Sequence, residues 1–147
     1  MRQLPTVEML NIGSQNSMVT HLGIEFIDVG PDFISAKMPV DQRTMQPLGL
    51  LHGGASVALA ETLGSVAASL QIDLQSKSCV GLEINANHLR SVRSGYVYGR
   101  ATPIHIGRRT QVWEIKISDA AQKPVSICRL TVMIIDRTTT KSETSPS

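Results

Sequence analysis

Residues 55–72 read ASVALAETLGSVAASLQI, and this stretch decides the fold. It consists mostly of Ala, Ser, Leu and Val, and Glu61 is its only charged residue. A helix that is apolar on nearly all sides has to be buried on most of its faces. The sequence therefore predicts a central helix around which the rest of the chain is wrapped.

The flanking segments predict β-strands. Residues 22–30 and 32–40 are short apolar runs that meet at Gly30 and Pro31, which is typical of a β-hairpin. A loop rich in Gly and Pro then leads into the helix. Four further strands are expected after the helix, at residues 79–89, 95–106, 110–118 and 125–135.

The strand at 110–118, TQVWEIKIS, alternates cleanly between apolar and polar residues. Trp113, Ile115 and Ile117 fall on one side, and this side is expected to face the core. The order of elements is a short helix, two strands, one buried helix and four strands without intervening helices. It predicts an α+β fold whose curled antiparallel sheet wraps a long central helix.

The sequence predicts a single domain over residues 1–136, opening with a helical segment over 1–21. In that segment Val7, Met9, Leu10 and Met18 have helical spacing, as in a lid or a packing helix. Residues 137–147 lose all apolar periodicity and are expected to form a disordered tail.

Composition narrows the function classes. A chain of 147 residues leaves no room for a two-domain cofactor enzyme. A net charge of +2 and 3% aromatic residues argue against a nucleic-acid partner. Cys79 and Cys128 are interpreted as buried reduced thiols, because neither has a second Cys or a His at metal-ligand spacing. Without a leader or an apolar span, the protein is predicted to be cytoplasmic, with no membrane partner.

Glu61 is the first candidate catalytic residue, because no cation lies near it in sequence to neutralise it. Burial would raise the pKa of this carboxyl group and make it a better proton acceptor near neutral pH. The structural alternative is an ion pair with an Arg from a strand. Ser65 lies one turn further on the same helical face and could hold a water or a substrate group, or could simply be small enough for close packing.

His52, Gly53 and Gly54 precede the helix, and backbone N–H groups at a helix N-terminus suit an oxyanion or a polarised carbonyl. The alternative is a tight loop that needs positive φ. Gly53 and Glu61 are separated by about 12 Å of helix, too far for one carbonyl to contact both within a chain. If both serve one reaction centre, the chain forms a two-fold dimer with shared sites.

Two further polar clusters, at residues 85–91 and 105–110, place basic side chains at the ends of predicted strands. They could hold phosphates or could simply be solvated. The four scattered His residues and the absence of a Ser-His-Asp set give no support for zinc or serine-nucleophile chemistry.

From about Leu22 to Ile135 the chain resembles the hotdog-fold acyl-CoA thioesterases. The resemblance rests on QPLGLLHGGASVALAETLGSVAA, VGLEINANHLRSVRSG and HIGRRTQVWEIKI, and on the spacing of Gln46, His52, Gly53, Glu61 and Ser65. It is strongest for the bacterial branch that hydrolyses 1,4-dihydroxy-2-naphthoyl-CoA in menaquinone biosynthesis, and for the related enzymes that clear aryl groups from an enterobactin carrier protein.

The resemblance implies roles for individual residues. Glu61 would activate water or attack the thioester carbon, and the Gly53 N–H would polarise the carbonyl. Gln46 would orient the water or the acyl group, His52 would lie against the thioester oxygen, and Ser65 would contact the water or the aryl portion. A second set would grip coenzyme A and its phosphates: Gly81, His88, Arg90, Ser91, His105, Gly107, Arg108 and Arg109. The pair Arg108-Arg109 departs from near relatives, which often carry one basic residue there.

The expected function is therefore hydrolysis of an aryl- or acyl-CoA without a metal or other cofactor, coenzyme A being part of the substrate. The resemblance implies a dimer, often paired into a tetramer, and an acyl carrier protein as a possible partner. Two other functions stay open: a hydratase or dehydratase on the same fold, and a non-catalytic acyl-CoA sensor. The sequence does not select the physiological acyl group.

Overall fold

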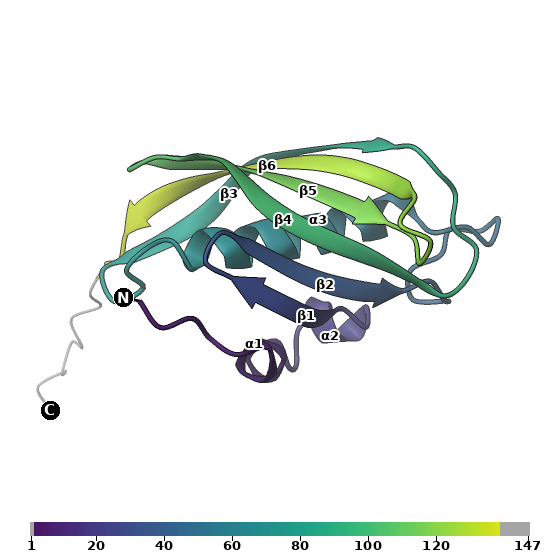
Figure 1. The fold of residues 1–147 in the computed structure, drawn as a ribbon, viewed down its shortest axis with the longest axis horizontal. Helices are drawn as coiled ribbons and strands as arrows, with labels where there is room; N and C mark the ends of the chain where they lie inside the picture. Colours follow the sequence, from purple (N-terminus) through teal and green to yellow (C-terminus); the bar gives the residue numbers. More distant parts are fainter. Residues whose placement is uncertain (1, 139–147) are drawn as a thin grey trace, which may run out of the picture.

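A computed structural model describes residues 2–138 of the chain. Its six strands form one antiparallel sheet in the order β1-β2-β4-β5-β6-β3, which curls around the long helix α3 (Figure 1). The strands are β1 (Glu25–Gly30), β2 (Phe33–Pro39), β3 (Lys77–His88), β4 (Tyr96–Ile106), β5 (Thr110–Ser118) and β6 (Pro124–Asp136). The predicted α+β class, the hairpin and all four later strands are confirmed.

The central helix α3 spans Gly53–Ser69, so it begins two residues before the predicted stretch and ends three residues before its end. The early start has a local cause. His52 acts as the N-cap, and its Nδ1 accepts a hydrogen bond from the Gly54 N–H at 2.8 Å. Leu70 forms the C-cap, and its N–H donates to the Val66 carbonyl at 3.1 Å.

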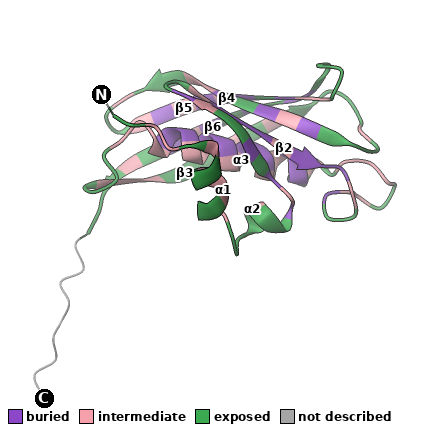
Figure 2. Ribbon diagram, turned by 60° about the horizontal axis from the view of Figure 1, so that its bottom comes forward, coloured by how far each residue is buried: buried purple, intermediate pink, exposed green. Residues whose placement is uncertain are grey.

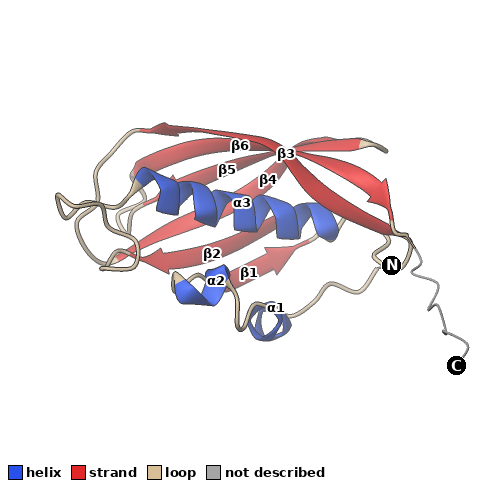
Figure 3. Ribbon diagram, turned by 180° about the vertical axis from the view of Figure 1, so that it is seen from behind, coloured by secondary structure: helices blue, strands red, loops and turns tan. Residues whose placement is uncertain are grey.

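One face of α3 packs on the sheet, and its buried residues are Ala55, Ser56, Leu59, Ala60, Leu63, Gly64, Ala67 and Ala68. The small residues let the helix approach closely: a Cβ at Gly64 would lie 2.5 Å from Leu130 Cδ2 on β6. The opposite face of α3 is only half-buried, and no strand of the described chain covers it (Figure 3). Every residue of α3 except Gly54 is buried or half-buried, as the prediction of a central helix requires.

Strand β5 carries the largest buried side chain, Trp113, on the core face together with Ile115 and Ile117, as its alternation predicted. Gln111 lies on the same face and is almost fully buried. Its Oε1 accepts a hydrogen bond from Trp113 Nε1 at 2.8 Å, and its Nε2 donates to the Ala68 carbonyl at 3.5 Å. Gln111 thus satisfies the indole N–H and ties β5 to the end of α3.

Two short helices precede the sheet, α1 (Val7–Gly13) and α2 (Met18–His21), and both lie largely exposed beside β1 and β2 (Figure 2). Asn11 holds α1 in place, because its amide exchanges hydrogen bonds of 2.8 and 3.0 Å with the backbone N–H and carbonyl of Phe26. Val7 and Leu10 pack against the core, whereas Met9 and Met18 are exposed. The latter two therefore do not belong to the predicted packing face.

Strand β3 closes the other edge of the sheet and pairs with β6 alone among the described strands. Exposed apolar side chains lie on or beside this edge, including Val80, Leu82 and Leu89. Its pairing register shifts between Gly81 and Glu83, which marks a β-bulge.

Arg137 follows β6 and is anchored, since its N–H donates to the Ser76 carbonyl at 2.9 Å. The predicted disordered tail therefore begins too early, and its remainder from residue 139 lies outside the described residues. No helix within residues 2–138 is long and apolar enough to cross a membrane.

Candidate active site

The N-terminus of α3 presents one unused backbone donor. The Gly54 N–H donates to His52 Nδ1, and the N–H groups of Ala55 and Ser56 donate to the His52 carbonyl at 3.0 and 3.2 Å. The Gly53 N–H makes no hydrogen bond to any described residue. A first-turn N–H has no intrahelical acceptor, so this group is free to bind a carbonyl oxygen.

Gly53 and Gly54 are glycines because a side chain would have no room there, and not because the backbone needs a positive φ. Neither has positive φ, so the alternative of a tight positive-φ loop is wrong. A Cβ at Gly53 would lie 2.8 Å from His88 Nε2, and one at Gly54 would lie 3.0 Å from the His52 ring. The bare Gly53 backbone therefore lies directly against the His88 imidazole of β3.

A cavity of about 370 Å³ opens beside the free N–H. Five residues predicted to form the site line it: Gln46, Gly53, His88, Arg90 and Ser91. Gln46 lies in a turn in which its Oε1 accepts from the Leu48 N–H and its backbone N–H donates to the Leu50 carbonyl. The Gln46 amide nitrogen makes no hydrogen bond to a described residue, so it can donate to a ligand, and the amide oxygen keeps a second lone pair.

Glu61 lies two turns further along α3 and contacts β3 instead of a cation. It is half-buried, and it forms no ion pair with any described residue, so the ion-pair alternative is not realised in the chain. Its Oε1 lies over Gly81, where a Cβ would come within 2.6 Å. Gly81 therefore lies directly beside the Glu61 carboxylate.

Ser65 lies one turn beyond Glu61 and is half-buried. The Sγ of Cys79 lies 3.8 Å from the Ser65 carbonyl oxygen, which places a thiol next to the site. Burial raises the pKa of the Cys79 thiol, so it stays protonated near neutral pH and offers no thiolate nucleophile. Cys128 is also free, is buried in the core, and has its pKa raised by the same cause.

Of the remaining predicted residues, His105 lies near the end of β4, and Gly107, Arg108 and Arg109 form the turn into β5. A Cβ at Gly107 would lie 2.6 Å from His105 Nε2, and the Arg109 carbonyl accepts from the Ile134 N–H at 2.8 Å. Met133 of β6 pairs with Thr110 of β5 on one side and with Val80 of β3 on the other. Thr110, which follows Arg109, is therefore level with Val80, which precedes Gly81. Arg108 and Arg109 are thus on the Glu61 side of the molecule.

The predicted site residues therefore form two groups within one chain. The first surrounds the N-terminus of α3: Gln46, His52, Gly53, His88, Arg90 and Ser91. The second lies towards its C-terminal half: Glu61, Ser65, Gly81, His105, Gly107, Arg108 and Arg109. Within one chain, the residues expected to grip coenzyme A are therefore divided between the two ends of the helix.

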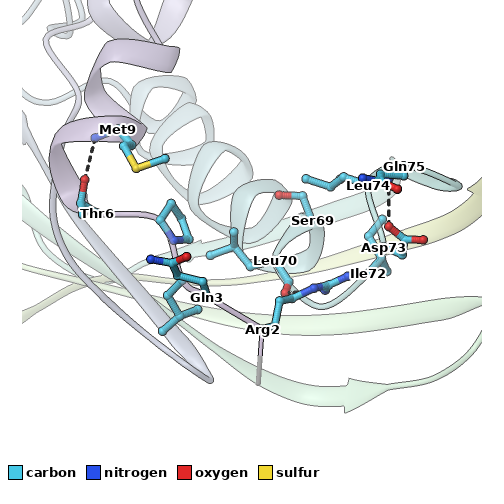
Figure 4. A pocket seen from close by; sticks show the side chains of 12 residues that line it. Arg2, Gln3, Thr6, Met9, Ser69, Leu70, Ile72, Asp73, Leu74 and Gln75 are labelled. Carbon is cyan, nitrogen blue, oxygen red and sulfur yellow. Dashed lines mark hydrogen bonds between the residues drawn. The ribbon is translucent and has the colours of Figure 1, made fainter.

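Two other features were not found from the sequence. A groove of about 330 Å³ runs between α2 and α3 and includes Glu61 in its lining. A separate cavity of about 450 Å³ lies at the far end of α3, where Arg2 Nη1 donates to the Leu70 carbonyl at 3.0 Å (Figure 4). None of the predicted site residues lines this cavity at the far end of α3. Residues 2–138 contain no cluster of three or more His, Cys, Asp or Glu side chains able to hold a metal ion.

Comparison with known proteins identifies the architecture. A family model described as the thioesterase superfamily matches residues 48–126, a range that includes Gly53, Glu61 and Gly81. The chain is 52% identical over 130 residues to the 1,4-dihydroxy-2-naphthoyl-CoA hydrolase of Escherichia coli, covering 88% of this chain and 95% of that protein. It is 48% identical over 130 residues to the proofreading thioesterase EntH of Klebsiella pneumoniae, covering 88% and 94%.

Solved structures agree with the sequence matches. A thioesterase from Haemophilus influenzae superposes with a TM-score of 0.88 at 56% identity and covers 91% of this chain and 93% of that one. A Staphylococcus aureus protein, solved as a mutant in which a glutamate is replaced by alanine, superposes with a TM-score of 0.80 at 36% identity, covering 82% and 99%. The same protein, described as a thioesterase enzyme, has also been solved with a glutamine replaced by alanine.

Proposed function

This chain belongs to the thioesterase superfamily and has its hotdog fold, and from that premise we propose that it hydrolyses an aryl- or acyl-CoA thioester at a site shared between two copies of the chain. The observation that carries the proposal is the pairing of an unused N–H donor at Gly53 with an unpaired carboxylate at Glu61. The first suits a thioester carbonyl, and the second suits activation of water.

In the proposed reaction the thioester oxygen accepts a hydrogen bond from the Gly53 N–H. Glu61 takes a proton from water while the hydroxide oxygen forms a bond to the thioester carbon. The tetrahedral intermediate then expels the coenzyme A thiolate, which takes up a proton, and the carboxylic acid is released. In the alternative route Glu61 itself forms the bond to the thioester carbon, the thiolate leaves, and water hydrolyses the resulting anhydride.

Gln46 and Glu61 are the pair we assign to positioning and activating the water. The glutamine and the glutamate replaced in the Staphylococcus aureus relative are separated by the same number of positions as Gln46 and Glu61. This matching spacing supports the assignment. Ser65 lies one turn from Glu61, where its hydroxyl is suited to hold the same water or the acyl group.

A dimer would complete the site. Gly53 and Glu61 are about 12 Å apart along α3, so one carbonyl cannot contact both within a chain. Strand β3 offers an unpaired edge on which Val80 and Leu82 are 40% and 53% exposed. If two β3 edges pair antiparallel about a two-fold axis, the Gly53 end of one chain approaches the Glu61 end of its partner. The same pairing would bring Arg90 of one chain and Arg108 and Arg109 of the other chain to one substrate.

The acyl group is proposed from the relatives. The 1,4-dihydroxy-2-naphthoyl-CoA hydrolase of Escherichia coli supports an aromatic acyl-CoA. The similarity to EntH supports a second candidate, an aryl group carried on an acyl carrier protein. If the acyl group is 1,4-dihydroxy-2-naphthoyl, we propose a role in the menaquinone pathway. We also propose a tetrameric assembly, as the family resemblance implies.

Thiol release from a panel of thioesters tests the activity. The panel contains a naphthoyl-CoA, benzoyl-CoA, a medium-chain acyl-CoA and an aryl-loaded carrier protein. Glu61→Gln should lose about a hundredfold or more in kcat, the scale of general-base catalysis. Glu25→Gln is the matched control, because Glu25 is an exposed carboxylate on β1. If Glu61→Gln retains full activity, the proposed role of Glu61 is wrong.

Complementation tests the shared site. Glu61→Ala and Gly53→Val chains, each inactive alone, are unfolded together, mixed in equal amounts and refolded. A hybrid dimer then holds one site with both native residues, so about a quarter of wild-type activity should return. A site built within one chain would give no recovery.

A further inference from the structure

The segment between β2 and α3 contains a small hairpin, residues 44–52, that carries Gln46 and ends at the cap of α3. The His52 N–H donates to the Thr44 carbonyl, and the Gln46 N–H donates to the Leu50 carbonyl, both at 2.8 Å. His52 is the N-cap and immediately precedes the first N–H group of the helix. Because backbone hydrogen bonds join the two arms of the hairpin, the Gln46 amide and this N–H group are held at a fixed separation.

The hairpin also forms one wall of the cavity beside the N-terminus of α3. Gln46, Leu50 and Leu51 line this cavity. Leu51 pairs antiparallel with Met45 in the other arm, and its N–H donates to the Val92 carbonyl at 2.8 Å. A shift of the hairpin would therefore move the cavity wall together with the groups proposed to act on the thioester.

Thr44 anchors the base of the hairpin to the sheet. Thr44 is buried, with 2% of its surface exposed, and its hydroxyl donates to the Pro39 carbonyl at 2.7 Å. The same oxygen accepts from the Asp41 N–H at 3.1 Å. Pro39 is the last residue of β2, where the backbone is paired with β4. Thr44 does not line the cavity, so its hydroxyl can affect a ligand only through the position of the hairpin.

The opposite end of the hairpin is an exposed turn that requires a glycine. Gly49 has φ of 77°, and its N–H donates to the Gln46 carbonyl at 3.0 Å. A Cβ there would meet nothing within 4 Å, so glycine is needed for the conformation and not for space. The neighbouring Leu48 is 78% exposed, and its N–H donates to Gln46 Oε1. The turn can therefore be strained without disturbing the core.

We propose that Thr44 is a positioning residue for thioester hydrolysis: its buried hydroxyl fixes the hairpin, which in turn sets the Gln46 amide and the Gly53 N–H against the substrate. The inference rests on the proposed thioesterase function and adds to it a residue that touches no substrate. A misplacement of about 1 Å in such groups can lower the rate about a hundredfold. Loss of the anchor should therefore lower kcat more than it changes KM, whereas a purely structural threonine would affect only stability.

The first test measures kcat, KM and thermal unfolding of the full-length protein, with the thioester of the panel that the wild type hydrolyses fastest. Thr44→Val keeps the shape of the side chain without its hydroxyl, and it should lower kcat by about tenfold or more while KM changes by less than about threefold. Thr44→Ser retains the hydroxyl and should keep kcat within about twofold of wild type.

Gln111→Leu is the matched control for a buried polar side chain. Gln111 also makes two hydrogen bonds in the core, but it ties β5 to the far end of α3 and not to the hairpin. This control should lower the melting temperature and leave kcat within about twofold of wild type.

A second pair of variants tests the hairpin even if Thr44→Val does not fold. Gly49→Ala places an alanine at positive φ in the exposed turn and should lower kcat by about threefold or more, because the strained turn moves Gln46. Gly95→Ala is its matched control: Gly95 has the same φ of 77°, and a Cβ there also meets nothing within 4 Å, yet it lies outside the hairpin. This control should keep kcat within about twofold of wild type.

The results that overturn the inference are distinct from those that overturn the function. If the wild type hydrolyses thioesters and a folded Thr44→Val protein keeps kcat within about twofold, the inference is wrong and the proposed function stands. Where Thr44→Val does not fold, an unchanged kcat of Gly49→Ala leads to the same conclusion. A control that loses as much kcat as its counterpart also overturns the inference, since the loss would then come from general destabilisation. If the wild type hydrolyses no thioester of the panel, the inference falls together with the proposed function.

Discussion

Gly81→Ala is the substitution whose effect follows most directly from the geometry. The new Cβ would lie 2.6 Å from Glu61 Oε1, whereas ordinary van der Waals contact begins near 3.4 Å. The carboxylate, as the end of a flexible side chain, must therefore move by roughly 0.8 Å, because the strand backbone is fixed by pairing with β6.

A displacement of about 1 Å in a catalytic group can cost about a hundredfold in rate. We therefore expect Gly81→Ala to lower kcat by about 30- to 100-fold with little change in KM, because the contacts to coenzyme A are unaltered. Stability should not fall. Alanine is preferred to glycine within a strand by roughly 0.5–1 kcal/mol, which offsets the cost of moving one flexible side chain.

The assay is steady-state thiol release with benzoyl-CoA, accompanied by thermal unfolding and sedimentation velocity. Gly13→Ala is the control, because a Cβ at Gly13 meets nothing within 4 Å. A Gly81→Ala protein that folds, keeps its oligomeric state and retains kcat within about twofold of wild type would refute the argument. The position of Glu61 against β3 would then not be the one used in the reaction.

Three further predictions concern the same site. Gly53→Ala should lower kcat by about tenfold or more, since its Cβ would lie 2.8 Å from His88 Nε2. The double variant Gly53→Ala/His88→Ala should lose less kcat than the product of the losses in the two single variants. In single turnover in ¹⁸O-labelled water, Glu61 should stay unlabelled if it acts as a base; label in the Glu61 peptide, measured by mass spectrometry, would show that the glutamate attacks the thioester and that water opens the anhydride at the Glu61 carbonyl. Burial raises the pKa of the Cys79 thiol, so its alkylation by iodoacetamide near pH 8 should be slower than that of a free thiol. The midpoint of the pH dependence of the alkylation rate should also lie at higher pH. A rate equal to that of N-acetylcysteine would contradict this prediction.

The sequence was sufficient for the elements whose patterns are local. The uncharged helix and the alternation around Trp113 both depend on neighbours within a few residues, and both were found. The start of α3 was missed because its cap is His52, which is not among the common N-cap residues. Gln111 was missed as a core residue because its burial depends on a bond to the Trp113 indole.

The site was harder to predict because its decisive contacts are long-range. His88 lies against Gly53, and Glu61 lies over Gly81, yet no periodicity links these positions. A glycine inside a strand is a signal for close approach of another group, and Gly81 carried that signal. The sequence alone could not show which group approached, because this depends on how α3 crosses β3 in the folded chain.

The division of the site between two ends of α3 leads to a last prediction. If each reaction centre needs Gly53 from one chain and Glu61 from its partner, specific activity must follow the fraction of chains that are paired. Dilution below the dimer dissociation constant should then lower activity per chain, and saturating substrate should restore it, because a ligand that binds only the dimer shifts the equilibrium towards it. Leu82→Asp, which places a charge on the exposed edge of β3, should move this transition to higher protein concentration without replacing a residue of either half of the site. Constant specific activity across dilutions at which sedimentation shows monomers would mean that one chain suffices, and that Gly53 and Glu61 do not both contact the reacting carbonyl.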